Sequence, residues 1–285
     1  MTSDLEKSFK AKLRFFAQET HRDPADLWQI ITLERFLVRL AQSPYHKQFI
    51  LKGGVLLSKY ISIGRETTDL DFLAQKINNE KYYLTTIFEN IANIDLNDGF
   101  SFKGIQVKEL AHPHMEYSGA RASMMAYFGK TRFKVVVDIG FGDIVDPIEY
   151  KVPLATSSKG DLFEKYVCLT CYPKEFIFAE KLETIIYRGA FNSRMKDFHD
   201  LYSMISSFLF LPSPHLKTIV NRVFKHRKTK FILPLFYRES DLNRMQFFWN
   251  DYLTDVHHDH LKYLPKAFSE IIHEINQWLL VNLKS

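Results

Sequence analysis

Hydrophobic residues recur with a helical period near both ends of the chain and with a strand-like pattern in its middle. From about residue 5 to 48, apolar positions such as Leu27, Ile31 and Leu37 return every three or four residues, which predicts helices. The run 49–51 predicts a short strand. After it we expect a helix over 55–61, a strand over 67–74 and a helix over 79–94.

Between about residues 100 and 141 the pattern is that of β-strands, which we expect over 102–110, 121–128 and 133–139. The last run contains Val135, Val136 and Val137 in succession, which predicts a strand buried on both faces. A carboxylate in such a strand needs a partner. Asp138 is therefore a candidate metal ligand.

From Pro173 onward the pattern is helical again. We expect a helix over 174–188 that ends at Gly189, one from a cap at Asn192 or Ser193 to residue 208, and one over 264–283. The change of pattern predicts two parts, an α/β part over 1–165 and an all-helical part over 166–285. The expected fold class is α+β.

Composition narrows the class of protein without naming a function. The chain has 285 residues, of which 46% are hydrophobic, and carries a formal net charge of +5, which favours a polyanionic partner only weakly. No apolar run is long enough for a membrane span, and residues 1–12 lack the apolar core of a signal peptide, so we expect a cytoplasmic protein. Cys168 and Cys171 have CxxC spacing inside a predicted strand, which favours reduced structural thiols over a zinc or redox site.

The strongest chemical signal is Lys52-Gly53-Gly54, followed fifteen residues after Gly54 by Asp69-Leu70-Asp71. Glycines allow backbone N–H groups to approach a phosphate, and the N-terminus of a following helix favours negative charge. In a strand Asp69 and Asp71 share one face, where two carboxylates favour a divalent cation. Together with Asp138 they predict a metal-dependent nucleotide enzyme.

The predicted helices after residue 173 contain further charged residues that are candidates for the functional site. Lys181 lies at the edge of an apolar stripe, where it either extends its ammonium to solvent or binds phosphate. Asp197 and Asp200 lie one turn apart near a predicted helix start, a position that helix electrostatics also favours. A basic segment with five cations in nine residues predicts contact with a nucleic-acid backbone, or else a solvated helix end. Its cations are Arg222, Lys225, Arg227, Lys228 and Lys230.

Four motifs in order make the chain similar to the AbiEii/AbiGii toxin family of nucleotidyltransferase-like proteins. They are Lys52-Gly53-Gly54 with Arg65-Glu66-Thr67-Thr68-Asp69-Leu70-Asp71-Phe72, then Val137-Asp138-Ile139-Gly140-Phe141-Gly142-Asp143, then Pro173-Lys174-Glu175-Phe176 with Ala179-Glu180-Lys181-Leu182, and Arg194-Met195-Lys196-Asp197-Phe198-His199-Asp200-Leu201.

The resemblance implies a polymerase-β-like nucleotidyltransferase domain, in which a mixed sheet is flanked by helices, followed by a helical bundle. It also implies the toxin of a type IV toxin–antitoxin pair, with an antitoxin encoded by an adjacent gene. By position, Asp69, Asp71 and Asp138 would bind Mg²⁺ or Mn²⁺, and Lys181 would neutralise the triphosphate. Asp197 or Asp200 would orient Lys181 or the acceptor, and the motifs do not distinguish the two. The expected nucleotide-binding residues are Lys52, Gly53, Gly54, Arg65, Thr67, Thr68 and Lys181.

The leading functional hypothesis is Mg²⁺-dependent transfer of an NMP from an NTP to an RNA hydroxyl, with the 3′ end of tRNA as the expected acceptor. One alternative keeps the reaction and moves the acceptor to a protein or small-molecule hydroxyl. The other is a catalytically silent module that binds RNA or protein. The preferred NTP and the oligomeric state are left open by the sequence.

Overall fold

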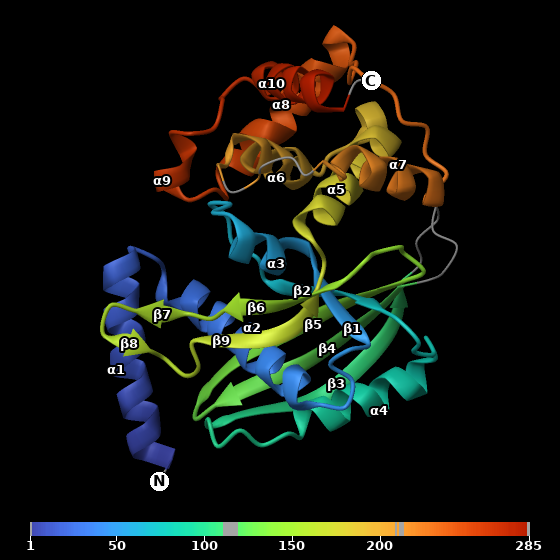
Figure 1. The fold of residues 1–285 in the computed structure, drawn as a ribbon. Helices are drawn as coiled ribbons and strands as arrows, with labels where there is room; N and C mark the ends of the chain where they lie inside the picture. Colours follow the sequence, from blue (N-terminus) through green and yellow to red (C-terminus); the bar gives the residue numbers. More distant parts are fainter. Residues whose placement is uncertain (1, 111–118, 209, 211–213, 284–285) are drawn as a thin grey trace. The chain divides into compact units, whose positions relative to one another are not determined.

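The computed structural model describes residues 2–110, 119–208, 210 and 214–283, and side chains from residue 6 onward. Helices and strands follow in the order that Figure 1 shows. The helices are α1 (Thr2–Thr20), α2 (Pro24–Gln42), α3 (Gly53–Tyr60), α4 (Lys81–Ala92), α5 (Lys174–Arg188), the 3₁₀ helix η1 (Gly189–Phe191), α6 (Met195–Ser206), α7 (Leu216–His226), α8 (Glu239–Leu253), α9 (His258–Leu261) and α10 (Phe268–Asn282). The strands are β1 (Phe49–Lys52), β2 (Asp69–Ala74), β3 (Phe100–Leu110), β4 (Gly119–Phe128), β5 (Thr131–Phe141), β6 (Ile148–Pro153), β7 (Thr156–Ser157), β8 (Gly160–Asp161) and β9 (Tyr166–Cys171).

The chain forms two compact units. Unit 1 comprises residues 1–56, 67–143 and 147–172, and unit 2 comprises 57–66, 144–146 and 173–285. The sequence pattern predicts that the first part ends at residue 165, whereas β9 lies in unit 1 because it pairs with β1 and β6.

Unit 1 is built on a seven-stranded sheet of order β3-β4-β5-β2-β1-β9-β6. The β2–β5 and β1–β9 pairs are parallel, and the β1–β2, β3–β4, β4–β5 and β6–β9 pairs are antiparallel. The mixed sheet with a helical C-terminal region confirms the predicted α+β class. The register places Asp71 beside Asp138 on the neighbouring strand.

One face of this sheet is covered by α2 and α4 (Figure 1). Phe72 of β2 packs edge-to-face on Phe49 of β1, which contacts Phe88 of α4, and Phe88 stacks on Phe36 of α2. Side chains alternate along a strand, so Asp69 and Asp71 lie on the face opposite Phe72. The apolar core thereby fixes which face carries the carboxylates.

The prediction that the 133–139 strand is buried on both faces is wrong. In β5 fully buried residues such as Val135 and Val137 alternate with half-buried ones such as Val136 and Asp138. The face with Asp138 is therefore partly open, and the side chain of Asp138 retains 24% of its exposure.

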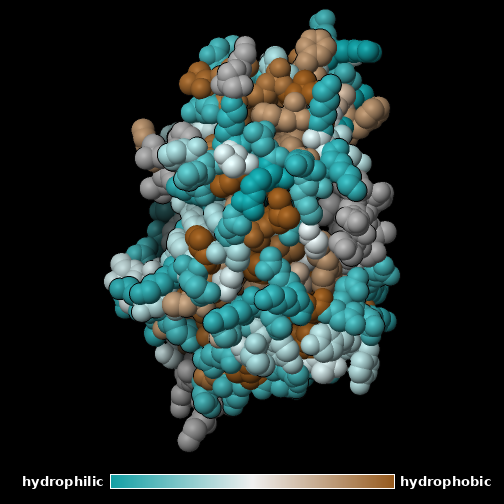
Figure 2. Space-filling view, turned by 45° about the vertical axis from the view of Figure 1, so that its right-hand side comes forward, coloured by the Kyte–Doolittle hydropathy of each residue, from teal (hydrophilic) through white to brown (hydrophobic). Residues whose placement is uncertain are grey.

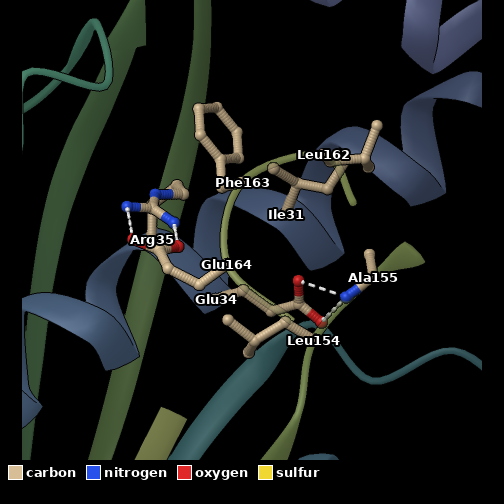
Figure 3. A pocket seen from close by; sticks show the side chains of 8 residues that line it. All are labelled: Ile31, Glu34, Arg35, Leu154, Ala155, Leu162, Phe163 and Glu164. Atoms are coloured by element: carbon tan, nitrogen blue, oxygen red, sulfur yellow. Dashed lines mark hydrogen bonds and ion pairs between the residues drawn. The ribbon is translucent and has the colours of Figure 1, made fainter. Parts of the chain in front are cut away.

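The connection between β6 and β9 is held against α2 by polar side chains (Figure 3). Both oxygens of Glu34 accept the N–H of Ala155, and Arg35 forms ion pairs with Glu164 and with the buried Asp98. The hollow between these residues is too small to admit water, so these contacts serve to anchor the connection.

Unit 2 is helical. Its core includes Phe198 of α6, Trp249 of α8 and Phe268 of α10, which are fully buried, and the ring of Phe268 contacts the rings of the other two. The predicted cap of the second helix in this region is wrong, because α6 begins one residue later, after Arg194. Asn192 instead accepts the N–H of Arg194 in the preceding turn.

Cys168 is exposed and Cys171 is buried on β9, both as free thiols, as the strand alternation predicts. Within the described part of the chain, no helix is long and apolar enough to cross a bilayer. On the face drawn in Figure 2, hydrophobic residues occur in small groups among hydrophilic ones.

Candidate active site

The glycine turn and the DxD motif come into direct contact in unit 1. Gly53 directly follows β1 and is the first residue of α3, with a φ of +69°, in the left-handed region. A Cβ atom on Gly53 would lie 2.0 Å from Oδ2 of Asp71, so no other residue fits without moving that carboxylate. Gly54, the second residue of α3, is buried. The turn is thus shaped around Asp71.

Four charged residues lie in one row across the sheet. The register pairs Lys52 of β1 with Asp71 of β2, Asp71 with Asp138 of β5, and Asp138 with Arg121 of β4. Residues paired in register point to the same face. Asp69 lies two residues before Asp71 on this face. The three carboxylates predicted from the sequence therefore share one face of two adjacent strands.

Asp138 has a protein partner in this row. Arg121 donates Nε to Oδ1 at 2.6 Å and a second guanidinium nitrogen to Oδ2 at 2.7 Å. The sequence predicted that Asp138 needs a partner but did not identify Arg121. No local signal reveals it, because the β4–β5 register depends on tertiary pairing.

Lys52 also has a partner on the same side of the molecule. Its ammonium donates to Asp143 at 3.1 Å and lies over the ring of Tyr172, 5.0 Å from the centroid. Asp143 belongs to the second motif and is buried, yet sequence reasoning did not single it out. A buried acid beside the phosphate-turn lysine would orient that lysine.

The oxygen donors of this row fit a divalent cation in their chemistry. Carboxylates are the ligands that Mg²⁺ and Mn²⁺ prefer. The described residues, however, contain no group of three acidic, histidine or cysteine side chains gathered to hold one ion. Asp69, Asp71 and Asp138 are candidate cation ligands because they share one face, and Asp138 is bound by Arg121.

A second charged cluster, in unit 2, is centred on Asp200. Arg65 donates Nε to Oδ1 at 2.9 Å and a second nitrogen to Oδ2 at 2.7 Å, and the Lys181 ammonium lies 2.5 Å from Oδ2. Asp200 is completely buried. A carboxylate in that position depends on both cations, since a buried charge without partners is costly.

Asp197 occupies the outer side of the same cluster. Its Oδ1 accepts from Lys181 at 3.3 Å and its Oδ2 from Arg194 at 2.9 Å. Lys181 is thus bound by both candidate acids, with the shorter distance to Asp200. The side chain of Arg194 is 45% exposed, so Asp197 connects the buried pair to the surface.

These contacts set the protonation states of the cluster. Burial alone would lower the pKa of Lys181, but Asp200 and Asp197 outweigh it and raise that pKa. Burial would raise the pKa of Asp200, but Lys181 and Arg65 hold it far below its usual range. Both groups are therefore charged at neutral pH.

Arg65, Thr67 and Thr68 lie in the segment between α3 and β2. Arg65 is engaged by Asp200, an arrangement that sequence spacing did not predict. Thr67 is half-buried, whereas Thr68 is exposed and accepts a hydrogen bond from Gln29 through its carbonyl.

The basic segment, residues 222–230, lies in unit 2, and two of its arginines have acidic partners there. Arg227 pairs with Glu180 and Glu183 of α5, and Arg222 pairs with Asp146. Arg222 is nevertheless exposed, as are Lys225, Lys228 and Lys230.

Comparison with known proteins identifies relatives of this arrangement. The family model described as "Nucleotidyl transferase AbiEii toxin, Type IV TA system" matches residues 35–273, a range that contains all four motifs. No curated protein sequence matches significantly.

One solved structure shares the fold at low sequence identity, and a second is similar to a lesser degree. MenT4, a nucleotidyltransferase toxin of Mycobacterium tuberculosis H37Rv, is 17% identical, with a TM-score of 0.53 over 96% of this chain and 99% of its own. A Helicobacter pylori protein assigned as a nucleotidyltransferase is 19% identical, with a TM-score of 0.48 over 92% of this chain and 96% of its own.

Proposed function

The chain belongs to the AbiEii family of nucleotidyltransferase toxins of type IV toxin–antitoxin systems, and we propose that it transfers an NMP from an NTP to an RNA hydroxyl. Membership confirms the resemblance inferred from the four motifs. The proposed acceptor is the 3′ end of a tRNA, and the proposed setting is the cytoplasm. An antitoxin encoded by an adjacent gene is the proposed partner.

The observation that carries this proposal is the row of carboxylates beside the glycine turn. Asp69 and Asp71 share a face with Asp138, and Asp71 rests against Gly53. Mg²⁺, or Mn²⁺, held by these acids would neutralise phosphate charge during the transfer. The backbone N–H groups of Gly53 and Gly54, together with Lys52, would hold the triphosphate.

The remaining roles in this proposal follow the family resemblance. The acceptor oxygen attacks the α-phosphorus, the bond from that phosphorus to the bridging oxygen breaks, and pyrophosphate leaves. A carboxylate oxygen of Asp138 takes the proton of the attacking hydroxyl. Lys181 neutralises charge on the triphosphate, and Asp200 and Asp197 fix the position of its ammonium. The exposed Lys225, Lys228 and Lys230 contact the RNA backbone.

The test is incubation with total cellular RNA, Mg²⁺ and each α-³²P-labelled NTP in turn. The wild-type protein is compared with Asp71→Asn and with Asp161→Asn, a matched control at an exposed aspartate of β8. We expect a labelled tRNA-sized band with wild type and Asp161→Asn, and none with Asp71→Asn. Transfer that survives Asp71→Asn would overturn the mechanism.

The same experiment separates the alternatives. Label in protein bands or in small molecules, with RNA unlabelled, would identify a different hydroxyl acceptor. No label in any acceptor, with RNA or protein binding that survives both chelation and Asp71→Asn, would identify a silent binding module.

A further inference from the structure

Arg121 is the cation of the carboxylate row that binds Asp138. It binds both oxygens of Asp138, at 2.6 and 2.7 Å, in the bidentate geometry that makes guanidinium–carboxylate pairs specific. This interaction uses the two oxygens that Asp138 would offer to a cation. As long as it is intact, Asp138 has fewer lone pairs and less negative charge to offer a cation.

The guanidinium also acts on the other two acids. Its hydrogen bonds with Asp138 raise the pKa of Arg121, and the charges of Asp69 and Asp71 raise it further. Arg121 thus acts electrostatically on all three carboxylates, and Lys52 is the other cation of the row. A divalent cation would perform the same electrostatic task with twice the charge.

The interaction is positioned to be exchanged. The Arg121 side chain is 47% exposed, in contrast with the buried arginines Arg35 and Arg39 of α2, at 2% and 1%. An exposed ion pair contributes little to folding, because water screens it. Its release therefore leaves the sheet intact, and the long side chain can turn toward solvent.

We propose that Arg121 and the divalent cation compete for Asp138. In the absence of a cation, Arg121 holds Asp138 and limits the site to the other two carboxylates. When the cation binds to Asp69 and Asp71, Asp138 exchanges its arginine for the cation. Arg121 is thereby a positioning residue that sets how readily the site is loaded, and this inference rests on the metal-dependent function proposed above.

The test measures Mn²⁺ affinity by electron paramagnetic resonance of the full chain, with no nucleotide present. The variants are Arg121→Gln, which removes the competitor, and Arg121→Lys, which keeps the charge but not the bidentate geometry. The matched control is Arg132→Gln, an exposed arginine on the same face of β5 and six residues, or about 20 Å, from Asp138. It changes the net charge equally without touching the row.

We expect Arg121→Gln to bind Mn²⁺ roughly fivefold to tenfold more tightly than wild type. The Mn²⁺ affinity of Arg121→Lys should lie between those of wild type and Arg121→Gln, and the affinity of Arg132→Gln should match wild type. Adding Asp138→Asn to Arg121→Gln should abolish the gain. Unchanged or weaker Mn²⁺ binding in Arg121→Gln, or an equal gain in affinity in Arg132→Gln, would overturn the proposal. If Arg121→Gln does not fold, the Mn²⁺ affinity of Arg121→Lys decides the test.

Failure of this inference is distinguishable from failure of the proposed function. Transfer that depends on Asp71 with no change in Mn²⁺ affinity for Arg121→Gln would refute competition alone. Tighter Mn²⁺ binding with no transfer from any NTP would support competition and refute the function.

Discussion

Gly53 and Asp71 fit together so closely that a Cβ atom on the glycine would lie 2.0 Å from Oδ2 of the aspartate. The two residues are eighteen positions apart in the sequence and meet because β1 and β2 are antiparallel neighbours. The glycine serves here both for its positive φ of +69° and for its missing side chain. Those two requirements can be separated by experiment.

Gly53→Ala should destabilise the protein more than Gly104→Ala. Gly104 has a nearly identical φ of +68° but open space where its Cβ would stand. Both variants should lose about 1–2 kcal/mol through the left-handed backbone, and Gly53→Ala about 1–3 kcal/mol more through the collision with Asp71. Urea denaturation measures the difference in free energy of unfolding, and equal losses would show that Asp71 moves aside freely.

The same pair predicts an effect on catalysis. Displacing Asp71 by about 1 Å should lower the transfer rate by on the order of 100-fold in Gly53→Ala. Gly104→Ala should retain the wild-type rate. A Gly53→Ala protein with full activity would remove the glycine turn from the proposed site.

Asp200→Asn should be more damaging to stability than Asp197→Asn. The first change leaves Arg65 and Lys181 without the carboxylate that both bind, at a cost of about 3–5 kcal/mol. The second change leaves Lys181 paired with Asp200 and removes the carboxylate that binds the surface residue Arg194, at a cost of about 1–2 kcal/mol. Denaturation curves of the two variants give the order directly, and the reverse order would contradict the geometry.

His199 should make unit 2 sensitive to acid. Burial lowers its pKa from 6.5 to about 4, with Arg65 and Lys181 acting in the same direction and Asp200 opposing them. Its Nδ1 lies 2.7 Å from the hydroxyl of Tyr252, which can donate to the neutral ring. The neutral histidine is thus the folded form.

The sign of the pH dependence follows. The unfolded state binds the proton first, so the contribution of His199 is complete above pH 6.5 and is lost as the pH falls toward 4, by up to about 3 kcal/mol. His199→Gln should remove that slope from a plot of unfolding free energy against pH. The exposed His226→Gln should leave it in place, and a slope that persists in His199→Gln would assign the effect to another group.

The exposed lysines of the basic segment should determine the salt dependence of RNA binding. Replacing Lys225, Lys228 and Lys230 by glutamine should reduce the slope of log affinity against log salt by about 2, since each contact with single-stranded RNA contributes about 0.7. Binding isotherms at several salt concentrations measure this slope. Glutamine at the exposed Lys47, Lys103 and Lys108 is the control, and an equal reduction there would mean that binding is not localised.

Local periodicity determined most of what the sequence could predict. The alternation of a strand places Asp69 and Asp71 on one face and Leu70 and Phe72 on the other, whatever the rest of the fold. The helical period and the glycine turn likewise act within a few residues. Each family motif also spans only a few residues and can be read directly from the sequence. The sequence alone was therefore enough to predict the fold class and the family.

Tertiary structure decided the partners. The register of β4 against β5 brings Arg121 to Asp138, and the packing of α5 and α6 with the segment before β2 brings Arg65 and Lys181 to Asp200. Tertiary structure also leaves the face of β5 that carries Asp138 partly exposed, whereas the three successive valines predicted burial on both faces. Such pairings are set by contacts between segments far apart in sequence, and a one-residue shift in register would give each charge a different neighbour.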